Sequence, residues 1–231
     1  MRYCQIYRTA EPKIVGVATG ASQVELIVNE SQPDYLNYLN FEKHFDFNNK
    51  EFWEKQYNVQ SLNPPIFNGV LRKKATVTDL MKYGQMFSYL SFIYSQKFID
   101  ILASFNVANY KAFPVAIKDV TELYYLLFLE GITCQEIIFD KSLVYTGHKV
   151  LNNLKYYEIS TNDEFIDLLE KEPLATFEKI AISKEHYLTD VINIQGAGAY
   201  FYSEKLIDFL LDCGITGMEI SYKNSMQLEF V

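Results

Sequence analysis

Short runs of apolar, β-branched and aromatic residues, bounded by turn-forming residues, recur along this chain. Runs of this length and composition are typical of β-strands. We therefore expect strands at residues 2–7, 24–28, 110–118, 137–140, 143–145, 177–182 and 218–222.

Other segments place apolar residues three or four positions apart, which is the spacing of one helix face. Thr161-Asn-Asp-Glu164 has the pattern of a capping box, so a helix is expected after it and is expected to end near Pro173. Thr78 is expected to cap a helix with Leu80, Tyr83 and Phe87 on one face.

Residues 33–68 are rich in aromatic side chains but show no clean period. We expect short helices and loops there, with one helix near Lys50–Tyr57. Tyrosine and tryptophan contribute strongly to protein interfaces because they bury a large area at little entropic cost. If some of these aromatic residues are exposed, the segment is a candidate contact surface.

One pattern occurs twice at a constant offset of 108 residues, since Phe92–Leu102 aligns without gaps with Tyr200–Leu210. A strand, a helix of about ten residues and a returning strand are expected in each copy. The identical pairs are Tyr94/Tyr202, Ser95/Ser203, Lys97/Lys205, Ile99/Ile207, Asp100/Asp208 and Leu102/Leu210.

The repeated residues have structural roles at the ends of the two expected helices. Ser95 and Ser203 are expected as N-caps, each contributing about 1 kcal/mol by accepting a backbone N–H. Asn106 and Gly214 are the residue types that best adopt the left-handed conformation after a helix. Because neither serine has a histidine or an acid at a shared spacing, we do not interpret either as a nucleophile.

These elements predict an α+β fold, with a mixed, largely antiparallel sheet, packed helices and a duplicated strand–helix–strand unit. We expect two regions. Residues 1–88 form an aromatic-rich N-terminal α+β region, and residues 89–231 hold the duplicated unit. The two are expected to pack together as one globular unit.

The net charge is −8 with a pI near 5.0, and arginine occurs only at positions 2, 8 and 72. Nucleic-acid binding needs a basic face, so this composition argues against it. An acidic surface either steers a basic partner or serves solubility. The longest apolar run, Leu123–Leu129, is too short for a membrane helix, and the first residues do not resemble a secretory signal. We expect a cytoplasmic protein without a membrane partner.

Candidate chemical groups are few. Gly196-Ala-Gly198 lacks the rest of a phosphate-binding loop and is interpreted as a turn. Glu185 and His186 could act as acid and base, but a surface role is favoured. The remaining cysteines and histidines are scattered and have no zinc-ligand spacing, so neither metal nor cofactor is expected; they are Cys4, Cys134, Cys213, His44 and His148. We assign no catalytic, cofactor-binding or metal-binding residue.

The second copy reads Phe-Tyr-Ser-Glu-Lys-Leu over residues 201–206, followed by Gly214-Ile-Thr-Gly217 and the apolar Met218-Glu-Ile220. This resembles the C-terminal signature of a bacterial immunity-protein family from polymorphic-toxin systems. That signature runs from two hydrophobic residues through Ser-Glu-Arg/Lys and a helix to Gly-x-x-Gly and an apolar strand. The resemblance covers residues 90–231. The first copy departs from it at Gln96 and Asn106.

Earlier segments are similar to the same family as well. They are Tyr94-Ser-Gln-Lys97 before Phe113-Pro-Val115, and the paired Tyr124-Tyr125 before Asp140-Lys-Ser142.

The resemblance implies a cytoplasmic, non-enzymatic protein that neutralises a cognate toxin by occlusion. Many such toxins are basic nucleases, which an acidic surface would capture quickly. Two alternatives remain: a small-molecule enzyme with a cleft between the repeat-bearing halves, and a protein-interaction module with no toxin partner.

Overall fold

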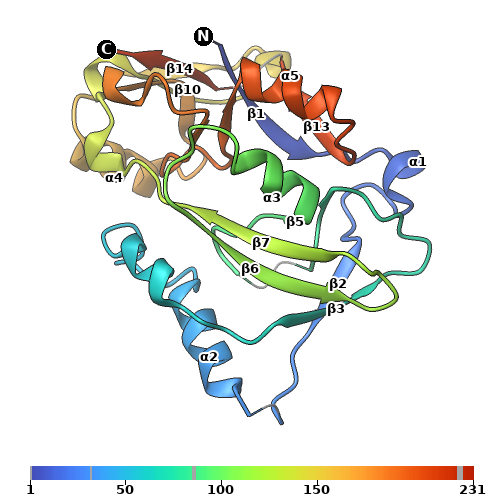
Figure 1. Cartoon of the computed structure of the whole chain (residues 1–231). Coiled ribbons are helices and arrows are strands. Elements are labelled where there is room, and N and C mark those ends of the chain that lie inside the picture. The colour runs from blue at the N-terminus through green and yellow to red at the C-terminus, as the bar shows by residue number, and fades with distance from the viewer. Residues whose placement is uncertain (1, 32, 85–86, 223–225) are drawn as a thin grey trace. The chain divides into compact units, whose positions relative to one another are not determined.

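The structure is a computed structural model that describes residues 2–31, 33–84, 87–222 and 226–231 (Figure 1). It divides into two units. Unit 1 comprises residues 1–6, 131–206 and 220–231, and unit 2 comprises residues 7–130 and 207–219. These limits differ from the expected regions 1–88 and 89–231, because the N-terminal strand β1 (Tyr3–Arg8) pairs with the distant strand β12 (Phe201–Ser203).

Unit 2 contains a six-stranded sheet of order β2-β3-β6-β7-β5-β4. Strands β3 and β6 pair in parallel, and the other neighbours pair antiparallel. The strands are β2 (Val24–Ile27), β3 (Phe67–Leu71), β4 (Leu80–Met81), β5 (Ile93–Ser95), β6 (Tyr110–Ile117) and β7 (Leu123–Leu129). The helices within residues 7–130 are α1 (Pro12–Val15), α2 (Tyr35–His44), a 3₁₀-helix (Gln56–Ser61) and α3 (Gln96–Leu102).

Aromatic side chains form the core between α2 and one face of this sheet. Phe41 of α2 lies 4.7 Å from Phe45 and 4.7 Å from Phe113 of β6, measured between ring centroids. Most of the aromatic residues in segment 33–68 are thus core, while Phe47 and Tyr57 are 84% and 63% exposed. Helix α3 covers the opposite face of the sheet, where Tyr125 of β7 donates a hydrogen bond to Gln96.

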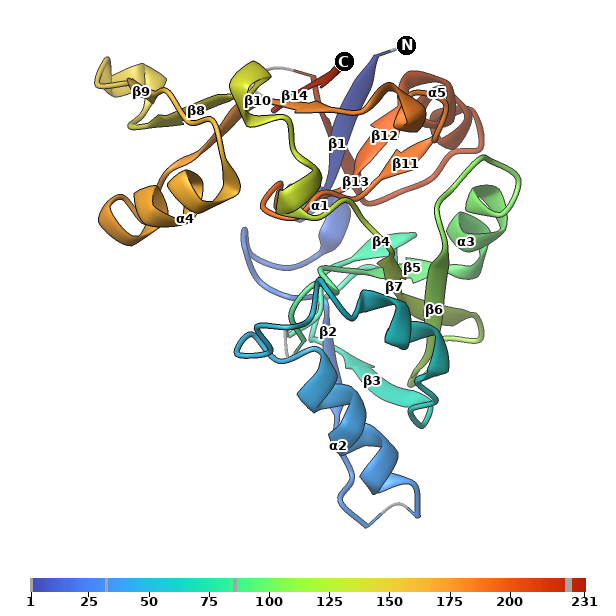
Figure 2. The ribbon, with the colours of Figure 1, turned by 90° about the vertical axis from the view of Figure 1, so that its left-hand side faces the viewer.

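Unit 1 contains a four-stranded sheet of order β14-β10-β8-β9, and helix α4 covers one of its faces (Figure 2). Phe165 and Leu168 of α4 are buried with Phe139, Val144 and Phe177. The elements are 3₁₀-helices (Cys134–Glu136, Phe139–Lys141, Lys149–Leu151, Lys184–His186), β8 (Leu143–Thr146), β9 (Lys155–Tyr157), α4 (Asn162–Lys171), β10 (Thr176–Ile182) and β14 (Gln227–Phe230).

A third sheet has the order β11-β12-β1-β13. Its further strands are β11 (Val191–Ile192) and β13 (Met218–Ser221), and helix α5 (Glu204–Asp212) follows β12. The strand order matches β4-β5-β7-β6 of unit 2, with β1 in the place of β7. In each case the strand before the helix and the strand after it are separated by one other strand. An origin of the two segments by duplication stays a prediction.

The α+β class, with mixed and largely antiparallel sheets, is confirmed. The helix expected after Thr78 is wrong, because Leu80 and Met81 pair as a strand with β5. The helix expected near residues 50–57 is also wrong: residues 51–55 form turns, and the α-helix lies earlier, at Tyr35–His44. No helix within the described residues is long and apolar enough to cross a bilayer.

The strand expected at residues 137–140 is replaced by the 3₁₀-helix Phe139–Lys141. A backbone bond from the Ile138 N–H to the Ala181 carbonyl, at 2.9 Å, joins this segment to β10. The hydroxyl of Ser142 donates to the Ile138 carbonyl and accepts from the Ala181 N–H. A side chain therefore makes the hydrogen bonds that the backbone of a paired strand would otherwise make.

Candidate functional site

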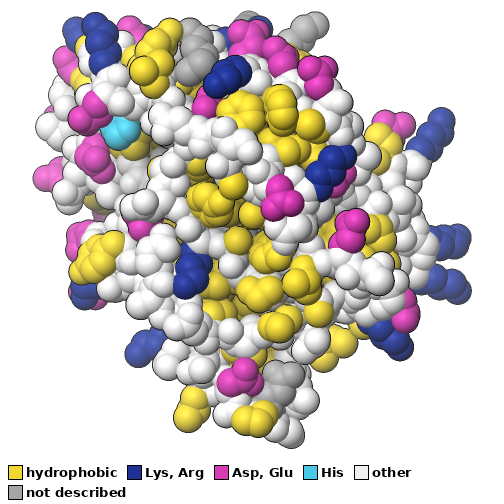
Figure 3. Space-filling model, viewed as in Figure 1, with side chains coloured by type: hydrophobic (Ala, Val, Ile, Leu, Met, Phe, Trp, Pro, Cys, Tyr) yellow, Lys and Arg dark blue, Asp and Glu magenta, His cyan; other side chains and the backbone are white. Residues whose placement is uncertain are grey.

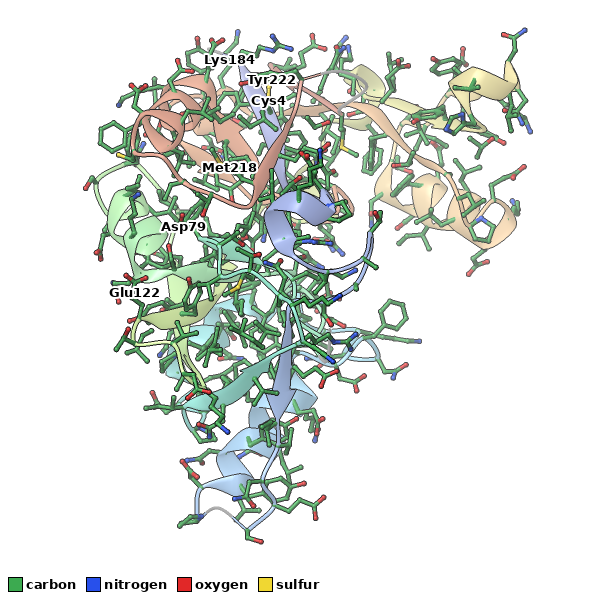
Figure 4. The ribbon with its side chains drawn as sticks, turned by 90° about the vertical axis from the view of Figure 1, so that its right-hand side faces the viewer. Cys4, Asp79, Glu122, Lys184, Met218 and Tyr222 are labelled. Carbon is green, nitrogen blue, oxygen red and sulfur yellow. The ribbon has the colours of Figure 1, made fainter. Side chains whose placement is uncertain are left out.

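The N-cap serine of helix α3 is part of a hydrogen-bonded cluster in unit 2. Ser95 Oγ accepts from the Phe98 N–H at 3.2 Å, as an N-cap does, and donates to Asp79 Oδ1 at 2.7 Å. Asp79 Oδ2 accepts from the backbone N–H and from the hydroxyl of Thr216, at 2.8 and 2.7 Å. Asp79, which is labelled in Figure 4, lies directly before β4 in the sequence.

The N-cap serine of α5 has the same arrangement in unit 1. Ser203 Oγ accepts from the Leu206 N–H at 3.2 Å and donates to Asp190 Oδ1 at 2.6 Å. Asp190 lies directly before β11, and its own carbonyl accepts from the Ser203 N–H at 2.8 Å. On the neighbouring strand β1, burial, followed by the nearby Asp190, raises the pKa of Tyr3 to about 12.

Both serines are confirmed as helix caps, and both side chains are fully buried. A buried hydroxyl that no substrate can reach is not a nucleophile, even with a carboxylate beside it. Sequence reasoning missed the two carboxylates. The signal that could have found them is an aspartate followed by two apolar residues, Asp79-Leu-Met and Asp190-Val-Ile, ahead of each serine.

Asp79 should make the stability of the chain depend on acid pH. Burial raises the pKa of its carboxyl. Hydrogen bonds from Thr216 and Ser95 lower the pKa by more than burial raises it, so in the folded protein the pKa lies below its ordinary value of 3.8. Such a group stabilises the fold fully above the ordinary pKa and loses that contribution as pH falls through the folded pKa.

We therefore expect Asp79→Asn to lower the unfolding free energy at pH 7 and to cost less at pH 3, because that contribution begins to fall once the pH is below 3.8. Urea denaturation of both proteins at the two pH values measures this difference. A cost that is equal at both pH values would contradict the assigned hydrogen bonds to the ionised carboxylate.

The other candidate groups do not form a reactive centre. His186 Nε2 lies 3.6 Å from Glu185 Oε1, so these neighbours do meet, but Glu185 is largely exposed on a single 3₁₀ turn. Gly196 and Gly198 have φ of +85° and +75° in a turn before β12. The three cysteines are free thiols, and burial raises the pKa of Cys134 to about 11, which disfavours the reactive thiolate.

No group of three or more metal-ligating side chains occurs among the residues that the structure describes. A polar hollow of about 650 Å³ lies beside the C-terminal end of α2. His44 lines it, and burial lowers the pKa of this histidine. The hollow is otherwise lined by exposed lysine, asparagine and acidic side chains.

A second hollow of unit 2, of about 690 Å³, lies between α3 and the C-terminal end of α5. Figure 3 shows apolar side chains gathered over α3, β6 and β7. Two of the charged side chains that line this hollow, Lys97 and Asp100, are hydrogen-bonded within the fold. The amine of Lys97 donates to the Cys213 carbonyl at 2.5 Å, and Asp100 accepts from Gln96 at 2.7 Å. These contacts tie helix ends and turns together rather than directing charges toward a ligand.

A strongly acidic segment runs through α4 in unit 1. Residues 158–178 contain seven acidic residues and one lysine, out of a net charge of −8 for the whole chain. Thr161 caps the helix as expected, accepting from the Glu164 N–H at 3.2 Å. In a capping box the Glu164 side chain would also accept from the N–H of the N-cap residue, Thr161. Here it accepts from the Ser160 N–H instead, at 2.7 Å.

No protein-family model matches the chain, and no curated protein matches it significantly. The similarity to the immunity-protein family rests on the residues quoted from the sequence.

Proposed function

We propose that this chain is a cytoplasmic immunity protein that binds a cognate bacterial toxin and neutralises it by occlusion, without catalysis of its own. The observation that carries the proposal is the outward surface of α4, where three carboxylates that make no hydrogen bond or ion pair with the described residues lie beside the exposed Ile166. A surface of this kind suits capture of a basic protein, since complementary charge raises the association rate.

The Gly-x-x-Gly signature supports the proposal from a different direction. Gly214, with φ of +65°, follows α5, and Gly217, with φ of +81°, lies against Thr78 and Leu80. Between them Thr216 binds Asp79. The residues that resemble the immunity family therefore build a rigid scaffold, which is what a protein acting by surface complementarity requires.

The proposal predicts that the chain protects a cell from the protein encoded beside its own gene. Expression of that neighbouring protein in a test bacterium should arrest growth, and co-expression of this chain should restore it. The two proteins should elute together as a 1:1 complex in size-exclusion chromatography with light scattering.

An unrelated acidic protein of equal net charge is the control. If protection came only from non-specific charge effects, that protein would protect the cell equally well. A neighbouring protein that is not toxic, or growth arrest that persists beside folded, abundant chain, would contradict the proposal. A complex without any effect on growth would instead favour an interaction module with no toxin partner.

A further inference from the structure

We infer that the outward face of helix α4 is the surface that binds the basic partner; this inference rests on the proposed function. The inward face of the helix is settled by packing. The ring of Phe165 lies 4.7 Å from Phe177 and 5.6 Å from Phe139, so α4 has one fixed orientation on the sheet. Asp163, Ile166, Asp167 and Glu170 follow the three- and four-residue spacing of one helix stripe, and all four are exposed.

The acidic residues near α4 divide into two groups by their contacts. Glu164 accepts from the Ser160 N–H, and Glu172 accepts from the Tyr157 hydroxyl at 3.1 Å, so both help to hold the fold. No hydrogen bond or ion pair within the described residues reaches the carboxylates of Asp163, Asp167 and Glu170. Like charges on one helix stripe repel each other, and of the three only Asp163, in the first turn, is placed to gain from the helix dipole.

Exposed apolar side chains lie within and beside this stripe. Ile166 is 48% exposed between carboxylates on both sides along the helix, and Leu174, three residues past the helix end, is 86% exposed. Protein interfaces commonly combine an apolar centre that loses its water with a polar rim. The stripe has that composition, with carboxylates as its rim.

Helix α5 provides a comparison within the same chain. Its Leu211 is also 48% exposed, and like α4 it carries one lysine, Lys205, among its acidic residues. The ring of its Phe209 lies 5.4 Å from Phe105. Charge distinguishes the two segments, because residues 158–178 contain seven acidic residues and one lysine whereas residues 200–220 contain four and one. Apolar exposure does not distinguish them. We assign to α4 a partner surface with lysine and arginine side chains around a small apolar recess.

The experiment uses the catalytically inactivated product of the neighbouring reading frame and titrates it calorimetrically against the full chain at low and moderate salt. Asp167→Lys/Glu170→Lys should weaken binding about tenfold or more and reduce the salt dependence. Asp208→Lys/Asp212→Lys on α5 makes the same change in net charge and should alter the Kd by less than about twofold. Ile166→Ser should weaken binding about tenfold, and Leu211→Ser should not.

All six substitutions in these four variants lie on exposed helix faces, and thermal unfolding of each variant checks that its fold is kept. If the wild-type chain forms the complex but the α4 variants bind as tightly as it does, or the α5 variants weaken binding instead, the α4 assignment is overturned and the proposed function stands. If the wild-type chain forms no complex, the proposed function falls and the assignment falls with it.

Discussion

Gly217→Ala is expected to lower the free energy of unfolding by about 3 kcal/mol or more, from a left-handed backbone cost and from steric overlap. The residue has φ of +81°, and a Cβ atom there would lie 2.5 Å from the Leu80 carbonyl oxygen and 2.6 Å from Thr78 Oγ1. Neither neighbour can move easily, because the Leu80 carbonyl belongs to β4 and Thr78 donates to that same oxygen at 2.9 Å. Urea denaturation measures the loss.

Gly214→Ala is the matched control. Gly214 also has a left-handed backbone, with φ of +65°, but a Cβ atom there would meet nothing within 4 Å. The cost should therefore be the conformational one alone, about 1 kcal/mol. If the two variants lose equal stability, the close approach of Gly217 to β4 is not what makes glycine necessary at that position.

The elements that could be predicted from the sequence are those set by local chemistry. Thr161 and Pro173 delimit α4, and Ser203 and Gly214 delimit α5, because caps act within one helical turn. The sequence predicts that the first helix of the repeat ends with Asn106 in the left-handed conformation. That prediction is wrong, since Asn106 does not have a positive φ. Without a glycine there, α3 ends at Leu102 and the chain leaves it through bonds of the 3₁₀ type.

The two wrongly placed helices, after Thr78 and near residues 50–57, have a common cause: in both segments apolar side chains are buried by neighbours on several sides. Leu80, Tyr83 and Phe87 are all buried, so their spacing reflects the core around them and not the stripe of a helix. In segment 33–68, the buried Tyr38 and Phe41 do have helical spacing, but the surrounding aromatic residues mask it. Tertiary packing decides such segments, and a single sequence does not show it.

The clusters around the two serines could be predicted only in part. The caps follow from the repeat, whereas the carboxylates come from strands that pair antiparallel with the strand before each helix. Asp79 precedes Ser95 by 16 residues and Asp190 precedes Ser203 by 13, so a comparison at fixed offset misses their equivalence. The segment between the aspartate and the serine differs in length between the two copies. Antiparallel pairing of the two strands nevertheless brings each aspartate beside its serine.

Ser203→Ala should be the more costly of the two cap deletions, at about 3 kcal/mol against about 2 kcal/mol for Ser95→Ala. Each variant loses an N-cap and withdraws a hydrogen bond from an aspartate. Asp190 is 4% exposed, so water cannot replace the hydroxyl at Oδ1, whereas the half-buried Asp79 can be reached by water.

The order of the two losses tests this account of the paired clusters, and parallel urea denaturation at pH 7 measures both. If Ser95→Ala loses as much unfolding free energy as Ser203→Ala, or more, then burial of the carboxylate does not decide the cost of removing the serine. A loss below about 1 kcal/mol for Ser203→Ala would mean that the serine does not cap α5. The predicted inequality holds only if the hydroxyl serves the helix and the buried carboxylate together, which is the structural role that excludes it from catalysis.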